Sequence, residues 1–302
     1  MRLPSSLLVF ASLLAAPWPA SAALRVVTTT EGLAALAREV GGDRVVVTSL
    51  SRGTQDPHFV DANPMLAVKL RDADLLVDVG LELEIGWLPP LVNQSRNAAI
   101  QPGGAHRFTA ASVIQVLDVP TGVVDRSRGD LHPGGNPHFL YDPRRGLQVA
   151  RGIAAKLGEL DPAGAAGYQS RAAAFTAQLE AAMARWKVQL APLQGRKIFI
   201  HHRTLTYFLD WSGLLSAGEM EPRPGTPPSS PHLADLVALG RKEGIKACVV
   251  ENYLDSKSDD LVARLIGGTV VRIPGDVGGD ATATTYQAWI DEMVRRITAA
   301  VK

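Results

Sequence analysis

The chain has 302 residues and a nearly balanced charge, with 31 lysine and arginine residues against 30 aspartate and glutamate residues. It carries neither a basic face nor an aromatic–basic motif, which argues against a nucleic-acid partner. The one cysteine, Cys248, lies in an apolar run and cannot form an internal disulfide, so we interpret it as a buried structural thiol and not as a metal ligand.

The N-terminus has the features of a cleavable signal peptide, which we place at residues 1–22. Arg2 supplies a positive start, residues 7–16 form a short apolar core, and residues 20–22 are small. The apolar segment is too short to cross a bilayer. We therefore expect an exported, periplasmic protein whose mature chain begins near Ala23.

Strand-like and helix-like segments alternate in the first half, which we assign to an N-terminal lobe at residues 23–160. The pattern predicts strands at 24–29, 44–50, 75–79 and 113–117, and helices at 31–40 and 64–71. Pro64 suits the first position of the second helix. Such alternation indicates a parallel sheet with helices on both faces.

A second block, residues 192–302, repeats this pattern. Here the strands are expected at 197–200, 215–217, 246–250 and 269–273, and the helices at 204–211, 230–242, 256–266 and 284–300. Gly213, Gly244 and Gly267 stand where three of the helices should end. We therefore predict a second α/β lobe.

Between the lobes, residues 161–191 carry the signal of one long helix. Asp161 is a good N-cap, and Pro162 suits the first helical position. No proline follows up to residue 190, so the helix would be roughly 40 Å long at about 1.5 Å per residue. The alternative is two shorter helices broken near Gly164 or Gly167. We favour the single helix, a stiff connection that limits hinge opening.

Three histidines in separate loops indicate a metal site in the cleft between the lobes. His58 and His138 end two similar turns, Asp-Pro-His and Asn-Pro-His, and either His201 or His202 follows the strand at 197–200. Ligands in open α/β sheets bind beyond the carboxyl ends of the strands. Imidazole is the commonest side-chain metal ligand, and three converging rings would suit zinc.

A fourth ligand is less clearly marked. Asp276 follows the last strand, and its carboxylate would complete a tetrahedral site and lower its charge. Glu251 and Asp280 are the alternatives. His132 lies close before His138 and could help to collect metal, but a single histidine in a glycine-rich loop is weak evidence, so it stays outside the predicted ligand set, as does Asp130.

The chain resembles a known family, the periplasmic zinc/manganese-binding receptors of ABC importers, whose two lobes are joined by a helical backbone. The resemblance rests on a specific Asn-Pro-His-x-x-x-Asp-Pro segment at 136–143, together with residues 55–58, residues 221–225, the spacing of His202 to Tyr207, and the long helix. It implies that His58, His138 and His202 are the first three ligands and that Asp276 is the aspartate ligand.

The expected function is that of a non-enzymatic, high-affinity zinc receptor that delivers the ion to an ABC transporter permease. A nitrogen-rich site favours Zn²⁺ over the harder Mn²⁺, which stays as the alternative because ligand type alone does not separate them. A monomer is expected, with a periplasmic metallochaperone as an optional second partner. Zinc affinity should fall below about pH 6, where free imidazoles become charged.

Two competing classes fit the sequence less well. A secreted zinc hydrolase would need a general base, but the chain has no His-Glu-x-x-His helix, and Glu251 is the one serious candidate for that role. A receptor for an organic solute would need aromatic side chains to stack against its ligand, and only 6% of the residues are aromatic. The metal receptor is therefore the preferred hypothesis.

Overall fold

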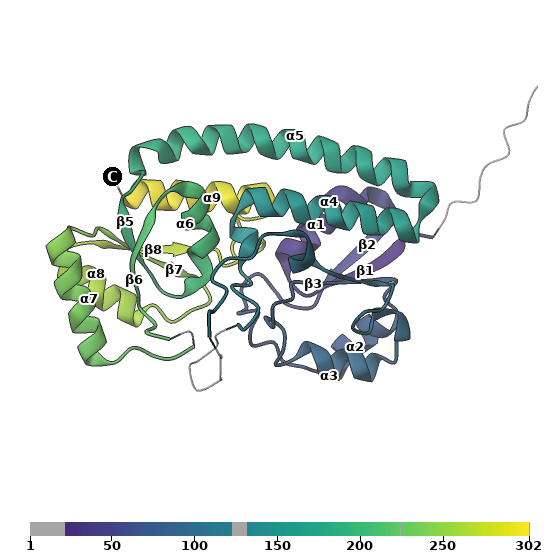
Figure 1. Cartoon of the computed structure of the whole chain (residues 1–302), viewed down its shortest axis with the longest axis horizontal. Helices are drawn as coiled ribbons and strands as arrows, with labels where there is room; N and C mark the ends of the chain where they lie inside the picture. Colours follow the sequence, from purple (N-terminus) through teal and green to yellow (C-terminus); the bar gives the residue numbers. More distant parts are fainter. Residues whose placement is uncertain (1–21, 123–131, 224, 302) are drawn as a thin grey trace, which may run out of the picture.

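A computed structural model describes residues 22–122, 132–223 and 225–301 of the chain. Two α/β lobes lie side by side, and one long helix runs across both of them (Figure 1). Residues 1–21 of the predicted signal peptide lie outside the described residues, as does Asp130. Within the described residues, no helix is long and apolar enough to span a membrane.

The N-terminal lobe contains a parallel sheet of four strands in the order β2-β1-β3-β4. Its strands are β1 (Leu24–Thr28), β2 (Val45–Ser49), β3 (Leu75–Asp78) and β4 (Arg107–Thr109). Its helices are α1 (Glu31–Gly41), α2 (Pro64–Arg71), α3 (Leu88–Ser95) and α4 (Pro143–Leu160). Alternate residues of β1 enter two different cores, since Val26 packs in the core of α1 and α4, whereas Val27 packs in that of α2 and α3.

The predicted strand at 113–117 is wrong. The fourth strand is β4, where Arg107 pairs with Leu76 in the ladder and its side chain forms an ion pair with Asp78 at 2.9 Å. Ile114 and Leu117 pack against the core from a loop. Their apolar character therefore reflects burial, while the true edge strand is held by a polar contact that the hydrophobic pattern does not reveal.

The C-terminal lobe repeats the arrangement, with strand order β6-β5-β7-β8 and all pairs parallel. Its strands are β5 (Lys197–Ile200), β6 (Leu215–Glu219), β7 (Ala247–Glu251) and β8 (Thr269–Ile273). Its helices are α6 (Thr206–Ser212), α7 (Ser230–Glu243), α8 (Lys257–Ile266) and α9 (Tyr286–Ala300). Gly213, Gly244 and Gly267 end α6, α7 and α8 in the left-handed conformation, as predicted.

The long helix α5 (Ala165–Leu190) has 26 residues, which gives it a length of about 39 Å. It follows a short 3-10 turn at Pro162–Gly164, in which the carboxylate of Asp161 accepts a hydrogen bond from the Gly164 amide. Its buried side recurs every three or four residues: Tyr168, Ala172, Phe175, Leu179, Ala182, Trp186 and Leu190. These residues belong to one hydrophobic core with residues of both lobes, so a single rigid helix is confirmed.

Shortening a side chain in this shared core should lower the free energy of unfolding. We predict that Leu179→Ala, at a fully buried position, lowers the free energy of unfolding by about 2–5 kcal/mol through lost contacts and a cavity. Urea unfolding of the metal-free protein measures the change. Val188→Ala is the control, because Val188 lies on the same helix with 74% of its surface exposed. Equal effects of the two variants would contradict the shared core.

Buried carboxyl groups near the carboxyl ends of the sheets, among them Glu251, Glu84 and Asp276, have raised pKa values. Burial raises the pKa of Glu251, at the end of β7, to about 7. Burial, followed by repulsion from Asp78, raises the pKa of Glu84 to about 7 as well. Both groups therefore hold protons in the folded state at a pH at which the unfolded chain has lost them.

This difference should make stability fall as the pH rises. Because the folded pKa values are raised, we predict that each group removes about 0.8 kcal/mol of unfolding free energy between about pH 6.5 and about pH 8. Because the buried Asp276 also has a pKa raised to about 7, Glu251→Gln should flatten this slope by about a third in urea unfolding of the metal-free protein. Glu180→Gln, on the exposed side of α5, should leave the slope unchanged. An unaltered slope in Glu251→Gln would refute the raised pKa of that group.

Candidate metal centre

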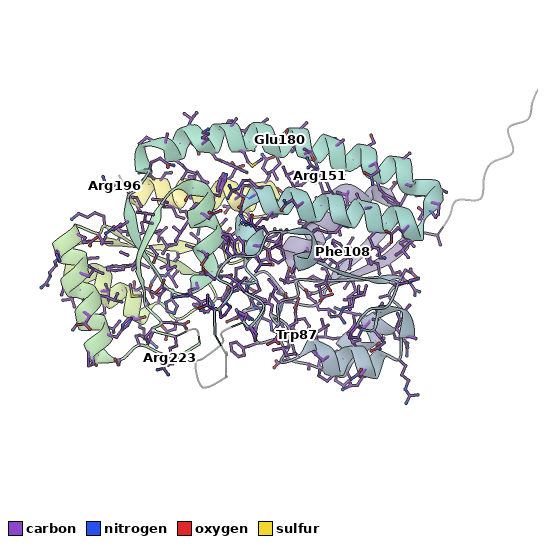
Figure 2. All side chains as sticks on the ribbon, in the orientation of Figure 1. Trp87, Phe108, Arg151, Glu180, Arg196 and Arg223 are labelled. Atoms are coloured by element: carbon purple, nitrogen blue, oxygen red, sulfur yellow. The ribbon has the colours of Figure 1, made fainter. Side chains whose placement is uncertain are left out.

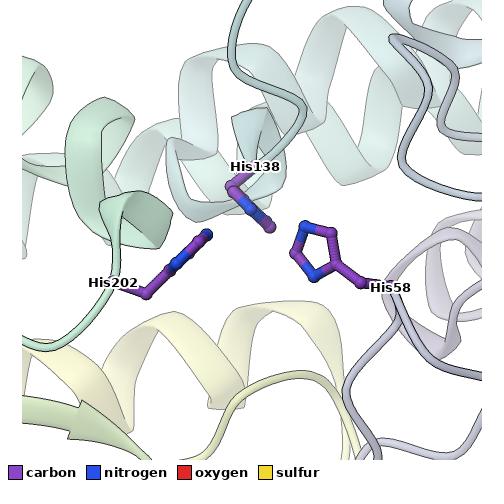
Figure 3. Close-up of side chains that lie close together, drawn as sticks. All are labelled: His58, His138 and His202. Carbon is purple, nitrogen blue, oxygen red and sulfur yellow. The ribbon is translucent and has the colours of Figure 1, made fainter. Parts of the chain in front are cut away.

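Three imidazole rings from separate loops point toward one another between the lobes (Figure 3). His58 follows β2, His138 precedes the 3-10 turn Phe139–Tyr141, and His202 follows β5. The ring centroids of the three pairs are 5.1, 5.5 and 5.6 Å apart. One nitrogen of each ring lies within 4.8 Å of the other two, a spacing that can hold a metal ion.

Short proline turns place the first two rings. The backbone amide of His58 donates to Oδ1 of Asp56 at 2.9 Å, and that of His138 donates to Oδ1 of Asn136 at 2.9 Å. In both turns the proline between the two residues fixes the backbone. The sequence similarity of the two turns therefore reflects the same local structure.

Contacts from elsewhere in the fold hold these turns in place. The buried Trp87 (Figure 2) donates from Nε1 to the carbonyl of Pro57 at 2.9 Å, next to His58. The hydroxyl of Tyr207, on α6, donates to the carbonyl of Asn136 at 2.7 Å, two residues before His138. The histidine loops are thus fastened to buried aromatic residues.

Carboxylates orient two of the rings. Nδ1 of His58 lies 2.7 Å from Oδ1 of Asp56, and Nδ1 of His202 lies 2.8 Å from Oε2 of Glu221. When Nδ1 carries the proton of such a bond, Nε2 keeps a lone pair for a metal. This is the usual arrangement of metal-binding histidines, whose second nitrogen donates to a carboxylate.

His138 differs because its Nε2 is buried and has no hydrogen-bond partner among the described residues. A buried polar atom without a partner costs about 1–3 kcal/mol. Burial, reinforced by the neighbouring His58 and His202, holds the pKa of His138 well below its ordinary value. The ring is therefore neutral with a free lone pair, which is the state that a metal ligand requires.

His201 lies outside this group. Its Nδ1 is 2.6 Å from Oδ2 of the buried Asp259. Burial lowers the pKa of His201, but the hydrogen bond and charge of Asp259 outweigh it, so the pKa is raised. Of the two adjacent histidines, His202 is therefore the one that the structure brings to His58 and His138.

Asp276 lies beside the histidines but outside their 4.8 Å group. Its carboxylate accepts hydrogen bonds from the amides of Gly32, at 3.0 Å, and Val277, at 2.8 Å. Burial raises its pKa to about 7. Asp276 and His138 both line a cavity of about 40 Å³, along with Thr30, Tyr141 and Tyr253. The carboxylate is therefore near the site while bound to the start of α1.

The two alternative carboxylates are placed differently. Glu251 is buried, and the nearby groups that affect its pKa are Thr204, His201 and Asp259. Asp280 forms an ion pair with Arg296 at 2.6 Å and accepts hydrogen bonds from Thr282. Neither carboxylate belongs to the group of the three histidines.

His132 is closer to the site than the sequence predicts. Its Nε2 lies 3.3 Å from Nε2 of His58, and its ring centroid is 6.4 Å from that of His138. Burial, followed by the neighbouring His58 and His202, lowers the pKa of His132 to about 4. In the sequence, its position six residues before His138 was the one sign of its approach to the site. A histidine in a glycine-rich loop of this kind is usually exposed to solvent.

Comparison with known proteins agrees with this geometry. Residues 26–300 match the family model described as zinc-uptake complex component A, periplasmic. The high-affinity zinc uptake system protein ZnuA of Paracoccus denitrificans is 29% identical over 303 residues, which cover 93% of this chain and 92% of the relative. The manganese ABC transporter substrate-binding lipoprotein PsaA of Streptococcus pneumoniae is 24% identical over 247 residues, 80% of this chain and 76% of the relative.

The fold is also shared with a solved structure. A crystal structure of ZnuA superposes with a TM-score of 0.78 at 23% sequence identity and covers 93% of this chain and 100% of that one. The likeness shows the two-lobed fold, and the family model extends over nearly the whole described chain. The chain therefore belongs to the family of periplasmic zinc-uptake components, the metal-binding receptors of ABC transporters.

Proposed function

We propose that this protein is a periplasmic receptor that binds Zn²⁺ with high affinity and delivers it to the permease of an ABC importer. One observation carries the proposal: three imidazoles converge, two with Nδ1 beside a carboxylate and the third with a buried Nε2 that has no hydrogen-bond partner in the described part of the chain. Such a set of nitrogen donors fits zinc. The names of the relatives, which include a high-affinity zinc uptake protein, support the same function.

His58, His138 and His202 are the proposed ligands. Asp56 and Glu221 supply negative charge behind the rings of His58 and His202, at whose Nδ1 atoms they lie. We propose Asp276 as a carboxylate ligand that joins the site by leaving the amide of Gly32. Its position on the shared cavity supports this role.

Manganese is the alternative metal. A relative named as a manganese ABC transporter substrate-binding lipoprotein aligns with 80% of this chain, which supports manganese as an alternative cargo for the same fold. The described ligand group contains three nitrogens and no oxygen, and nitrogen donors favour zinc. The donor set thus supports zinc as the cargo of this chain.

A hydrolase is less well supported than a receptor. A general base must reach the metal-bound water, and Glu251 was the one candidate in the sequence. Glu251 is buried, and the groups that affect its pKa, Thr204, His201 and Asp259, belong to the C-terminal lobe. We therefore propose a non-enzymatic, monomeric receptor that works with a separate permease and is open to loading by a metallochaperone.

Removal of the buried ligand should abolish tight binding. We predict that His138→Ala weakens zinc affinity by at least about 100-fold. Mutation of a residue that only hydrogen-bonds to a metal ligand already lowers metal affinity by about 10–100-fold, and His138 is a proposed ligand itself. The variant should remain folded, because it removes a buried polar atom that lacks a partner. A competition titration against a chelator measures the affinity. His106→Ala, ahead of the amino end of β4, is the control, and equal affinity of the two variants would exclude His138 as a ligand.

The carboxylate of Glu221, which lies at Nδ1 of His202, should affect zinc affinity although it is not a proposed ligand. We predict that Glu221→Gln weakens zinc affinity by about 10–100-fold, because the neutral amide supports the Nδ1 proton of His202 less well. Glu219→Gln, two residues earlier on β6, is the matched control and should bind as the unaltered protein does. A wild-type affinity for Glu221→Gln would show that the contact at 2.8 Å does not tune the site.

A further inference from the structure

The loop between β3 and α3, residues 80–87, has a strained backbone. Leu81 and Glu82 follow each other with φ of 54° and 65°, directly after Gly80 with φ of 86°. Residues other than glycine rarely adopt this left-handed conformation, because their Cβ comes too close to the following carbonyl oxygen. Such residues persist where other contacts hold them, and they gather at ligand-binding sites. The contacts that hold this loop therefore bear on function.

The side chain of Glu84, of which 4% is exposed, supplies these contacts. Its Oε1 accepts hydrogen bonds from the hydroxyl of Thr29 at 2.6 Å and from the amide of Val79 at 2.7 Å. Its Oε2 accepts from the amide of Gly80 at 3.2 Å. Thr29 follows β1 and Val79 follows β3, and these two strands are paired. One carboxyl group therefore ties the loop to the carboxyl ends of two neighbouring strands.

The neighbouring buried carboxyl group, Asp78, has a different role. Its Oδ1 accepts hydrogen bonds from Nε of Arg107 at 2.9 Å and from the hydroxyl of Thr109 at 3.1 Å. Both donors lie on β4, so Asp78 fastens the edge strand to the sheet. The hydrogen bonds of Glu84 go instead to strand ends and to the loop that leaves them. Stability of the sheet alone therefore does not account for Glu84.

The strained loop ends in the side chain that holds the turn of His58. The amide of Trp87, a residue labelled in Figure 2, donates to the carbonyl of Glu84 at 3.1 Å. Nε1 of Trp87 donates in turn to the carbonyl of Pro57 at 2.9 Å, and Pro57 directly precedes His58. A chain of hydrogen bonds therefore runs from the strand ends through Glu84 and Trp87 to the backbone beside a proposed ligand.

The loop also lies against the other side of the site. Leu83 lines the cavity of about 40 Å³ that His138 also lines. Leu81 lies close to the segment before His138, because a Cβ atom at Gly134 would be 2.9 Å from the Leu81 side chain. A displaced loop would therefore disturb the surroundings of His138 as well as those of His58.

We propose that Glu84 is a positioning residue for the metal site, whose carboxyl group holds residues 80–87 in the strained conformation that lets Trp87 fix the turn of His58. This inference rests on the proposed function, because it concerns the affinity of the same three histidines. Without the hydrogen bonds of Glu84 the left-handed residues relax, and Trp87 moves away from the carbonyl of Pro57. Metal affinity depends on such outer supports because they set the orientation of the ligands.

A double-mutant cycle in the full mature chain tests the inference, with zinc affinity measured by competition against a chelator. Glu84→Gln keeps the side-chain shape but replaces one acceptor oxygen by a donor, and Trp87→Phe removes the Nε1 donor. We expect each variant to bind zinc about 10-fold more weakly. The double variant should bind about as weakly as either single one, because both changes break one chain of contacts. Glu82→Gln, the same change at an exposed position of the loop, is the control and should keep the affinity of the unaltered protein.

Thr29→Val gives a second cycle that does not depend on the folding of Trp87→Phe. It removes one donor to Glu84 and keeps the side-chain shape, so its loss of affinity should be contained in that of Glu84→Gln. Urea unfolding of the metal-free variants reports any change in stability separately.

A Glu84→Gln variant that binds zinc with unaltered affinity, whatever its stability, would overturn the inference, because the loop would then support the fold alone. Independent effects of Glu84→Gln and Trp87→Phe, which multiply to about 100-fold in the double variant, would overturn it as well. Absence of zinc binding by the unaltered protein would instead refute the proposed function.

Discussion

The hydrophobic core shared by α5 and both lobes is the constraint on which the site depends. Buried residues of α5 such as Phe175 and Trp186 belong to the same core as Val26 of the first sheet and Ile200 of the second. Because this core joins the lobes, the loops that follow β2 and β5 stand at a set distance from each other. His58 and His202 meet there, with ring centroids 5.6 Å apart.

Polar contacts of the three histidine rings determine which ring nitrogens are available to a metal ion. Asp56 and Glu221 turn two rings so that Nε2 faces inward, and burial keeps His138 neutral. Neutral imidazoles bind metal, whereas protonated ones repel it, so we expect these contacts to set both the affinity of the proposed site and its loss in acid. The carboxyl group of Asp276, with its pKa raised by burial, accepts hydrogen bonds from the amide of Gly32, at the start of α1, and from that of Val277.

Much of this arrangement was predictable from sequence because it is local. Proline turns marked His58 and His138, and glycines marked the ends of helices. The misassigned strand at 113–117 shows the limit, since apolar loop residues resemble a strand when the true one, β4, is fixed by an ion pair to Asp78. Long-range contacts were harder to predict: the hydrogen bond between Asp276 and Gly32 joins residues 244 positions apart, and the position of His132 shortly before His138 was only a weak sign of its approach to His58.

The most direct test of the central claim is a titration of the metal-free mature protein with Zn²⁺ and Mn²⁺ in parallel, followed by thermal melting. We predict one tightly bound zinc ion per chain and a melting temperature that rises with free zinc, since a ligand that binds only the folded state stabilises it. Manganese should give a smaller rise at equal concentration. Stabilisation by neither ion would contradict the account, because three converging imidazoles would then not form a metal site.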